Sequence, residues 1–230
     1  MAGSLLNSAL AFALLLVATV QANAVQKTAD WPSLRFHFTL KRDTMKIHGQ
    51  SQFDIYGNPI VSAKTNTVLY DAFATFTEHT TLYNYTLLHG VAYSSSTPYT
   101  GSPEDDSKAK PTVACLDKET AKLPSINAIV AAIGDATAVN KASGSNFDCS
   151  SGSLFKVTVN RVEFALCASG STGFKLQGTD MDISVEFLES HIDIYVPKLA
   201  EKKRLQCTSV ASPSPITPVG KALLTGQPVP

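Results

Sequence analysis

The sequence has little of what marks an enzyme or a nucleic-acid-binding protein. Lys and Arg together number 19, Asp and Glu also number 19, and the net charge is zero with His neutral. A balanced chain has no strong attraction for nucleic acid or anionic membranes. It also lacks a Gly-x-Ser-x-Gly elbow, a His-Glu-x-x-His motif and a glycine-rich phosphate loop. We therefore expect no catalytic residues, no metal site, no cofactor and no nucleic-acid partner.

Long hydrophobic runs are missing except at the N-terminus, where residues 9–20 are almost entirely apolar. This run is shorter than the ~20 residues that a membrane-spanning helix needs. It is followed by Gln21-Ala-Asn-Ala24, a small-x-small cleavage pattern, and no basic stop-transfer cluster comes after it. The sequence predicts a signal peptide over 1–24 rather than a membrane anchor, and a secreted, extracellular protein that begins near Val25 and has no transmembrane anchor.

Cysteine is scarce, and no Cys-x-x-Cys pair is present to suggest a zinc site. An even number of cysteines in an oxidising compartment predicts two disulfides. Spacing alone leaves their pairing open. The sequon Asn84-Tyr85-Thr86 makes Asn84 the expected glycosylation site. The four cysteines are Cys115, Cys149, Cys167 and Cys207.

Alternating apolar and polar residues are the main structural signal. In residues 34–40, for example, Leu and Phe alternate with Arg, His and Thr, which is typical of a half-buried strand. The phase of the alternation flips at Asn160-Arg161, which indicates a two-residue turn or a bulge. We expect a mainly β protein: an antiparallel curved sheet or a two-sheet half-barrel or sandwich. Other expected strands are 50–56, 67–77, 80–88, 91–93, 155–159, 162–166, 174–177, 183–188 and 192–196, with a turn at 57–59.

One short helix is expected over 125–133, because Ser125 can cap its start and Gly134 can end it. Residues 94–110 and 142–153 are predicted to be loops. From residue 208 onward the chain is rich in Pro and Ser, which predicts an extended, disordered tail. The expected organisation is a signal peptide at 1–24, a single β-rich domain at 25–207 and a tail at 208–230.

Acidic residues offer two weaker hypotheses. The triplet Glu104-Asp-Asp106 could hold calcium, but without EF-hand spacing a solvated loop is favoured. Asp182 and Glu186 share strand parity, so paired carboxylates could serve a glycoside hydrolase. Alternating acids are also what the wet face of an amphipathic strand looks like. The pair His191 and Asp193 is interpreted in the same way, as strand surface.

Aromatic residues are the most distinctive feature, because they fall on both parities of the predicted strands. A closed core under the helix and loops would account for them. A curved sheet with a partly open concave face would instead expose them to an apolar ligand. The candidate wall residues for such a ligand are Phe53, Tyr70, Phe73, Phe76, Phe164, Phe174 and Phe187.

The order of several motifs resembles the ependymin-related proteins over about residues 50–207. A meander ends in Leu88-His-Gly90-Val91-Ala-Tyr93, and a loop leads to Cys115-Leu-Asp-Lys. A long strand ends at Cys167, Val185-Glu-Phe-Leu188 follows, and Tyr195-Val196-Pro197 leads to Cys207. This family has an open, two-sheet half-barrel like that of bacterial lipoprotein carriers. The resemblance implies binding of hydrophobic or lipid ligands and, in some members, calcium.

The resemblance also implies a pairing of Cys115 with Cys207, which leaves Cys149 with Cys167. That second bridge requires the chain to reverse near residues 160–161, because one straight strand would separate its ends by ~40 Å. The local alternative, Cys115–Cys149 with Cys167–Cys207, stays open on loop entropy, which differs by only ~1 kcal/mol.

These observations support a leading functional hypothesis, a secreted protein that binds a hydrophobic, lipid-like ligand in an apolar half-barrel. The alternatives are a secreted effector or adhesion-type protein that binds an extracellular protein partner without a small-molecule pocket, and the secreted glycoside hydrolase.

Overall fold

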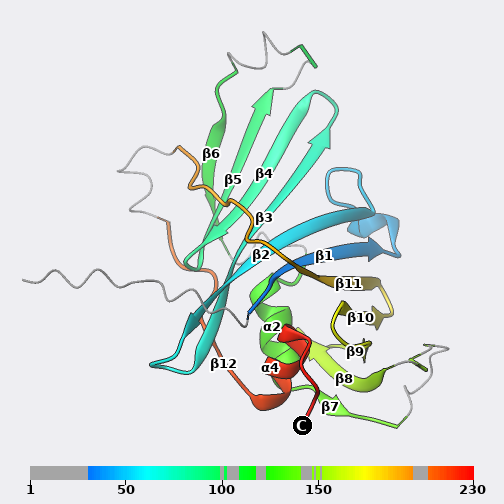
Figure 1. Ribbon diagram of the computed structural model, residues 1–230. Helices are drawn as coiled ribbons and strands as arrows, with labels where there is room; N and C mark the ends of the chain where they lie inside the picture. The colour runs from blue at the N-terminus through cyan, green and yellow to red at the C-terminus, as the bar shows by residue number, and fades with distance from the viewer. Residues whose placement is uncertain are drawn as a thin grey trace, which may run out of the picture.

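The fold is described here from a computed structural model (Figure 1). The described residues are 31–98, 101–102, 109–117, 123–140, 147, 149–150, 152–198 and 207–230. The expected signal peptide over 1–24 and the acidic triplet 104–106 lie outside these residues, as does most of the expected loop at 142–153.

Twelve strands form one antiparallel sheet, which confirms the mainly β expectation. Its order is β6-β5-β4-β3-β2-β1-β11-β10-β9-β8-β7, with β12 paired to β3. No ladder among the described residues joins β6 to β7, so the curved sheet stays open. The strands are β1 Ser33–Leu40, β2 Gln52–Ser62, β3 Thr67–Glu78, β4 Thr81–Leu88, β5 Val91–Pro98, β6 Thr112–Leu116, β7 Thr137–Ala138, β8 Ser153–Val159, β9 Val162–Ala168, β10 Gly173–Gly178, β11 Met181–Leu188 and β12 Ser214–Pro215.

Strand β1 lies in the middle of the sheet and defines its two faces. Its alternation is that expected from the sequence, with Leu34, Phe36 and Phe38 fully buried and Arg35 and His37 half-buried on the other side. Directly paired residues of antiparallel strands share a face. The register therefore assigns every strand position either to the inner face, which carries the core, or to the outer face.

The hairpin between β8 and β9 explains one of the two disulfides. Asn160 and Arg161 have φ of 49° and 70°, the left-handed pair that a two-residue hairpin turn requires. The chain reverses there, so Cys149 and Cys167 come within 5.5 Å between Cα atoms and form a disulfide. Cys115 pairs with Cys207 across 92 residues. The local alternative pairing is therefore wrong.

Helix α2, Ile126–Gly134, forms where the sequence predicts it. The Ser125 hydroxyl caps it by accepting from the Ala128 amide at 3.1 Å. Ile129 and Ile133 are fully buried against the inner face. The only other helical turns in the described residues are a short 3-10 helix, η1 Asp43–Met45, and a second α-helix near the C-terminus.

That second helix, α4 Pro218–Thr225, overturns the expectation of a disordered tail at 208–230. The Thr217 hydroxyl caps it, Pro218 opens it, and Gly226 ends it at φ 69°. Leu223 and Leu224 are 3% and 2% exposed, since α4 packs beside α2 and against β10 (Figure 1). The single domain expected to end at residue 207 therefore continues through α4.

The turn expected at 57–59 is also wrong, because β2 runs straight through it. Strand β1 stops pairing with β2 at Gly57, so beyond that point β2 pairs with β3 alone. Proline is tolerated where a strand has such a free edge. A side chain at Gly57 would lie 3.2 Å from the Tyr70 ring, which accounts for the glycine.

Two other strand limits differ from the sequence expectation. Strand β5 continues to Pro98, so residues 94–98 of the expected loop pair with β4, and in part with β6. Residues 191–198, within which a strand was expected, form no strand and are called the strap here. The backbone of Ile192 bonds to a side chain instead: the Ile192 carbonyl accepts from Asn58 Nδ2 at 2.6 Å, and the Ile192 amide donates to Asn58 Oδ1 at 3.1 Å.

Within the part of the chain that the structure describes, no helix has the length and apolar character needed to cross a bilayer.

Candidate functional site

The seven predicted wall residues do not form one open wall. Six of them lie on the inner face and Phe73 lies on the outer face, opposite Tyr56 of β2. Five of the inner six are at most 6% exposed, and Phe187 is half-buried. Those five are Phe53, Tyr70, Phe76, Phe164 and Phe174.

The inner residues separate into two groups. Phe174 and Phe187 lie 6.3 Å apart between ring centroids, in the half of the sheet where α2 and α4 pack. Helix α2 contacts β8 and β3, and α4 contacts β10. A crevice of about 220 Å³ beside the C-terminal end of α4 is lined mostly by glycines and other small residues. The helices therefore turn this half of the predicted wall into core.

The second group, on β2 and β3, leads toward the end of the sheet that extends beyond both helices (Figure 1). Phe53 stacks on Phe38 at 5.2 Å and contacts Phe76 at 5.1 Å. Phe76 in turn meets the Tyr85 ring edge-on at 5.6 Å. The aromatic layer thus runs from the buried core onto β4, where it becomes more exposed.

On β4 the inner face carries Tyr83, Tyr85 and Leu87, all half-buried, which are called the aromatic row here. Across from them on β5 and β6 the inner face carries small residues, of which Ala114 is exposed. The inner surface of β4, β5 and β6 is therefore an aromatic row beside a shelf of small side chains, both accessible to solvent.

His48 joins the β1–β2 loop to the aromatic row. Its ring stacks on Tyr83 at 3.9 Å between centroids, and Nε2 lies 2.6 Å from the Tyr85 hydroxyl. Its Nδ1 lies 2.8 Å from Glu78 Oε2. Burial, followed by the neighbouring Tyr83 and Glu78, raises the pKa of Tyr85, so this hydroxyl stays protonated and can donate to Nε2.

The loop that carries His48 is compact. Ile47 and Gln50 exchange both backbone hydrogen bonds, around a turn in which His48 and Gly49 have φ of 48° and 75°. Met45 and Ile47 pack against the core. His48 therefore acts as a latch that holds this loop against the inner face at the rim of the aromatic row.

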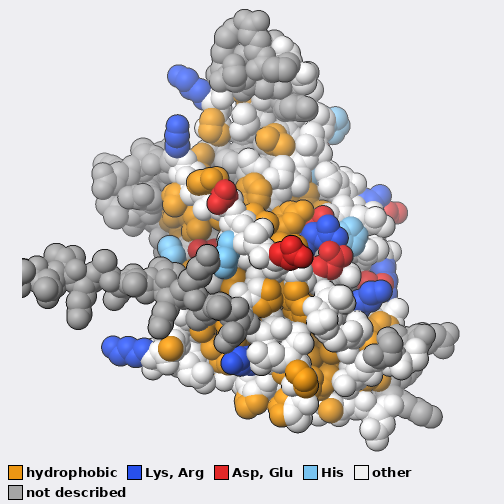
Figure 2. All heavy atoms as spheres, in the orientation of Figure 1, with side chains coloured by type: hydrophobic (Ala, Val, Ile, Leu, Met, Phe, Trp, Pro, Cys, Tyr) orange, Lys and Arg blue, Asp and Glu red, His pale blue; other side chains and the backbone are white. Residues whose placement is uncertain are grey.

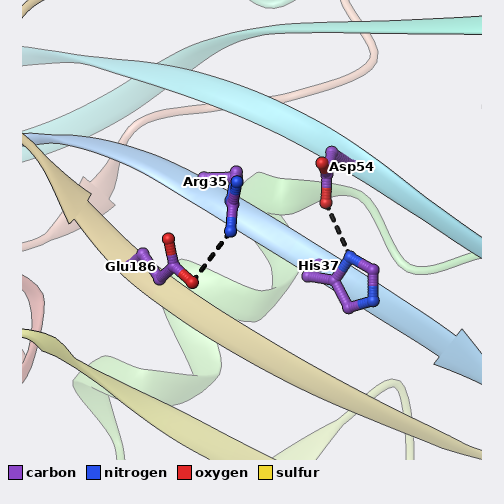
Figure 3. A network of polar contacts seen from close by, with 4 residues as sticks. All are labelled: Arg35, His37, Asp54 and Glu186. Carbon is purple, nitrogen blue, oxygen red and sulfur yellow. Dashed lines mark hydrogen bonds and ion pairs between the residues drawn. The ribbon is translucent and has the colours of Figure 1, made fainter.

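The outer face has a different chemistry. Arg35 donates to Glu186 at 2.8 Å, and His37 Nδ1 lies 2.7 Å from Asp54 (Figure 3). Figure 2 shows acidic and basic side chains side by side in the middle of this face. Asp182 is likewise paired, with Lys41 at 2.8 Å. Both carboxylates of the hydrolase hypothesis thus lie on the outer face in ion pairs, Glu186 with Arg35 and Asp182 with Lys41.

From Asn58 of β2 the strap crosses the outer face of the sheet toward β6 (Figure 1). His191 Nδ1 lies 3.1 Å from the Ser33 hydroxyl, so the histidine anchors the strap, while Asp193 is exposed. Tyr195 and Val196 are 75% and 50% exposed. Thr86 and Tyr93, on the outer face of β4 and β5, are at most 6% exposed, so at this end of the sheet the outer face is better covered than the inner one.

Sequence reasoning missed the aromatic row, His48 and the shelf of small residues. Tyr83, Tyr85 and Leu87 alternate within a correctly predicted strand, so their shared face was readable. The shelf was hidden because Ser-rich sequence favours a loop. His48 had no local signal, since its partners are 30 and 37 residues away.

Asn84, the expected glycosylation site, lies on the outer face of β4, where its Oδ1 accepts from the Thr75 hydroxyl at 2.8 Å. A glycan at this position would project from the face opposite the aromatic row.

The chain matches no family model, no curated protein and no solved structure.

Proposed function

We propose that the protein is a secreted, extracellular binding protein that holds a hydrophobic, lipid-like ligand on the inner surface of β4, β5 and β6. The observation that carries the proposal is the change in burial along the inner face. Inner-face aromatic side chains are buried from β1 to β3 and are only half-buried at Tyr83 and Tyr85, beyond the reach of α2 and α4.

Half-buried aromatic side chains on a curved sheet are a surface that an apolar ligand would cover. Burying apolar surface contributes about 25 cal/mol per Å², so a ligand covering ~200 Å² of it would gain about 5 kcal/mol before the costs of association. Small residues across from the aromatic row leave room for such a ligand. The His48 latch places a compact loop at its rim.

Two further features support an extracellular role. The disulfides suit an oxidising compartment. A glycan on Asn84 would leave the inner surface free.

The ependymin-like motif order is part of this proposal, and the observed Cys115–Cys207 pairing is the one that the resemblance implies. An open half-barrel is its other structural expectation, and the sheet is open.

The proposal is tested with a solvatochromic dye, Nile red, on the full mature chain from a eukaryotic secretion host. We expect saturable binding with a blue-shifted emission. Ala114→Trp, on the inner face of β6, should weaken binding at least about tenfold because the indole fills the space beside the aromatic row. The matched control is Thr77→Trp, at an exposed outer-face position of β3, which should bind like the wild type.

A folded wild-type protein that does not bind Nile red would contradict the proposal. Equal dye affinity of the two tryptophan variants would contradict it as well. Circular dichroism and melting curves establish that each variant is folded.

A second candidate function is an interaction with an extracellular protein partner through the strap. It is favoured by the exposure of Tyr195 and Val196, adjacent large apolar side chains on a segment anchored at His191 and Ile192. Binding of the labelled protein to intact cells, compared with a Tyr195→Ser/Val196→Ser variant, tests it. Equal cell binding by the two proteins would remove this candidate.

A further inference from the structure

The chemistry of the inner surface points to a particular class of ligand, on the condition that the proposed function is right. The aromatic row on β4 faces a row of hydroxyls on the next two strands. Ser94 is paired directly with Tyr85, Ser96 with Tyr83, and Thr112 with Ser96. We call Ser94, Ser96 and Thr112 the hydroxyl row. Directly paired side chains are about 5 Å apart, so one ligand can touch both rows.

Within the described residues, the hydroxyl row serves no structural hydrogen bond of the protein. Ser94 and Ser96 are half-buried and Thr112 is exposed, so all three reach solvent. Within the described residues their side chains have no hydrogen-bond partner. Ser95, one position along on the outer face, is in contrast 7% exposed. Three free hydroxyls at one side of an aromatic surface are donors and acceptors for the polar end of a ligand.

None of the three strands carries a charged side chain. The inward positions of β4 are Thr81, Tyr83, Tyr85 and Leu87, and those of β5 and β6 are Ala, Ser, Pro, Thr and Leu. The nearest acid on an adjoining strand, Glu78 of β3, is already bonded to His48. A carboxylate or phosphate head group would find no Lys or Arg on these three strands and would lie near Glu78. Buried anions are stabilised only when they are paired.

We propose that the ligand is a neutral amphipath whose apolar body lies on the aromatic row and whose hydroxyl-bearing head bonds the hydroxyl row. Monoacylglycerols and sterols have this chemistry. Free fatty acids and anionic phospholipids, which carry a negative head group, do not fit it.

The test compares three probes with the same acyl chain on the full mature protein at pH 8, by displacement of Nile red: monopalmitoylglycerol, palmitate and methyl palmitate. We expect monopalmitoylglycerol to bind at least about tenfold tighter than palmitate, because the three strands carry no Lys or Arg to pair with the carboxylate. We expect it to bind severalfold tighter than methyl palmitate, which lacks hydroxyls.

A Ser94→Ala/Ser96→Ala variant should lower the affinity for monopalmitoylglycerol severalfold, to about that for methyl palmitate. Thr97→Ala, on the outer face of β5, is the control. Palmitate binding as tight as that of monopalmitoylglycerol would overturn this inference and leave the proposed function standing. No binding of any probe or of the dye would instead remove the proposed function. The wild-type comparison decides the matter even if the double variant fails to fold.

Discussion

Asn127 of α2 bonds both backbone groups of Tyr70: its Oδ1 accepts from the Tyr70 amide at 2.8 Å, and its Nδ2 donates to the Tyr70 carbonyl at 2.9 Å. Strand β4 pairs with β3 only from Ala72 onward, and β12 pairs with β3 only at Thr67 and Val68. The Asn127 amide fills the gap between them. One side chain therefore acts as a missing strand residue and fixes α2 to the sheet.

Replacing Asn127 with Ala should lower the free energy of unfolding by about 2–4 kcal/mol, because two buried backbone groups lose their partners. Urea denaturation followed by circular dichroism measures the loss. Asn140→Ala, at an exposed position, is the control and should be within about 0.5 kcal/mol of the wild type. Equal stability of the two variants would show that Asn127 does not hold α2 to β3.

The Tyr70 hydroxyl is fully buried and has no hydrogen-bond partner within the described residues. Burial also raises the pKa of this phenol, so it stays neutral. Tyr70→Phe removes an unsatisfied polar group at nearly constant shape and should raise the free energy of unfolding by about 1 kcal/mol. A variant less stable than the wild type in urea would mean that the hydroxyl has a partner, such as a buried water.

Asp71 gives a pH prediction. Its carboxylate accepts from the His89 amide at 2.7 Å, and burial raises its pKa above the usual 3.8 despite that bond. Because the folded-state pKa is the higher one, its contribution to stability is fully present below pH 3.8 and is lost as the pH rises through the folded-state pKa.

Asp71→Asn keeps the acceptor without the charge. At pH 7 the variant should be at least as stable as the wild type, and its relative advantage should shrink on acidification toward pH 3.8. Asp71→Ala, which also loses the acceptor, should cost about 1 kcal/mol or more. Melting temperatures across pH 3–8 measure both; an advantage of Asp71→Asn that grows on acidification would contradict the assignment.

His48 gives a dynamic prediction. His48→Asn removes the stacking and cannot bond Glu78 and Tyr85 together, yet Asn tolerates the left-handed φ of 48°. Amide exchange in residues 43–50 should become at least about tenfold faster, because the latch no longer resists local opening. The matched control is His79→Asn, at an exposed position with φ 52°, which should leave the loop unchanged. Unchanged exchange in the His48 variant would mean that packing of Met45 and Ile47 alone holds the loop.

Much of the sheet could be predicted because its signals are local. The alternation of β1 and the hairpin at Asn160-Arg161 are set by neighbours in sequence, and so is the Ser125 cap of α2. Helix α4 also carried local signals in Thr217, Pro218 and Gly226, but the Pro- and Ser-rich composition around them favoured disorder.

The remaining features depend on tertiary contacts. The strap alternates Ile192, Ile194 and Val196 like a strand, yet Asn58 takes the hydrogen bonds of Ile192 as the segment crosses the sheet. The prediction of one continuous aromatic wall was wrong because α2 and the unexpected α4 cover half of these residues. The part of the inner face that stays uncovered depends on where α2 and α4 pack. The alternation of residues within a strand does not predict this.

Photo-crosslinking tests the central claim most directly. The protein is incubated with a neutral monoacylglycerol that carries a diazirine in its acyl chain. It is then irradiated, and the labelled sites are mapped by peptide mass spectrometry. We predict labels in residues 81–98 and 112–116, centred on Tyr83, Tyr85 and Leu87, which are competed by unlabelled monopalmitoylglycerol. Labels confined to the strap at 191–198, or none above a photolysed control protein, would contradict the account.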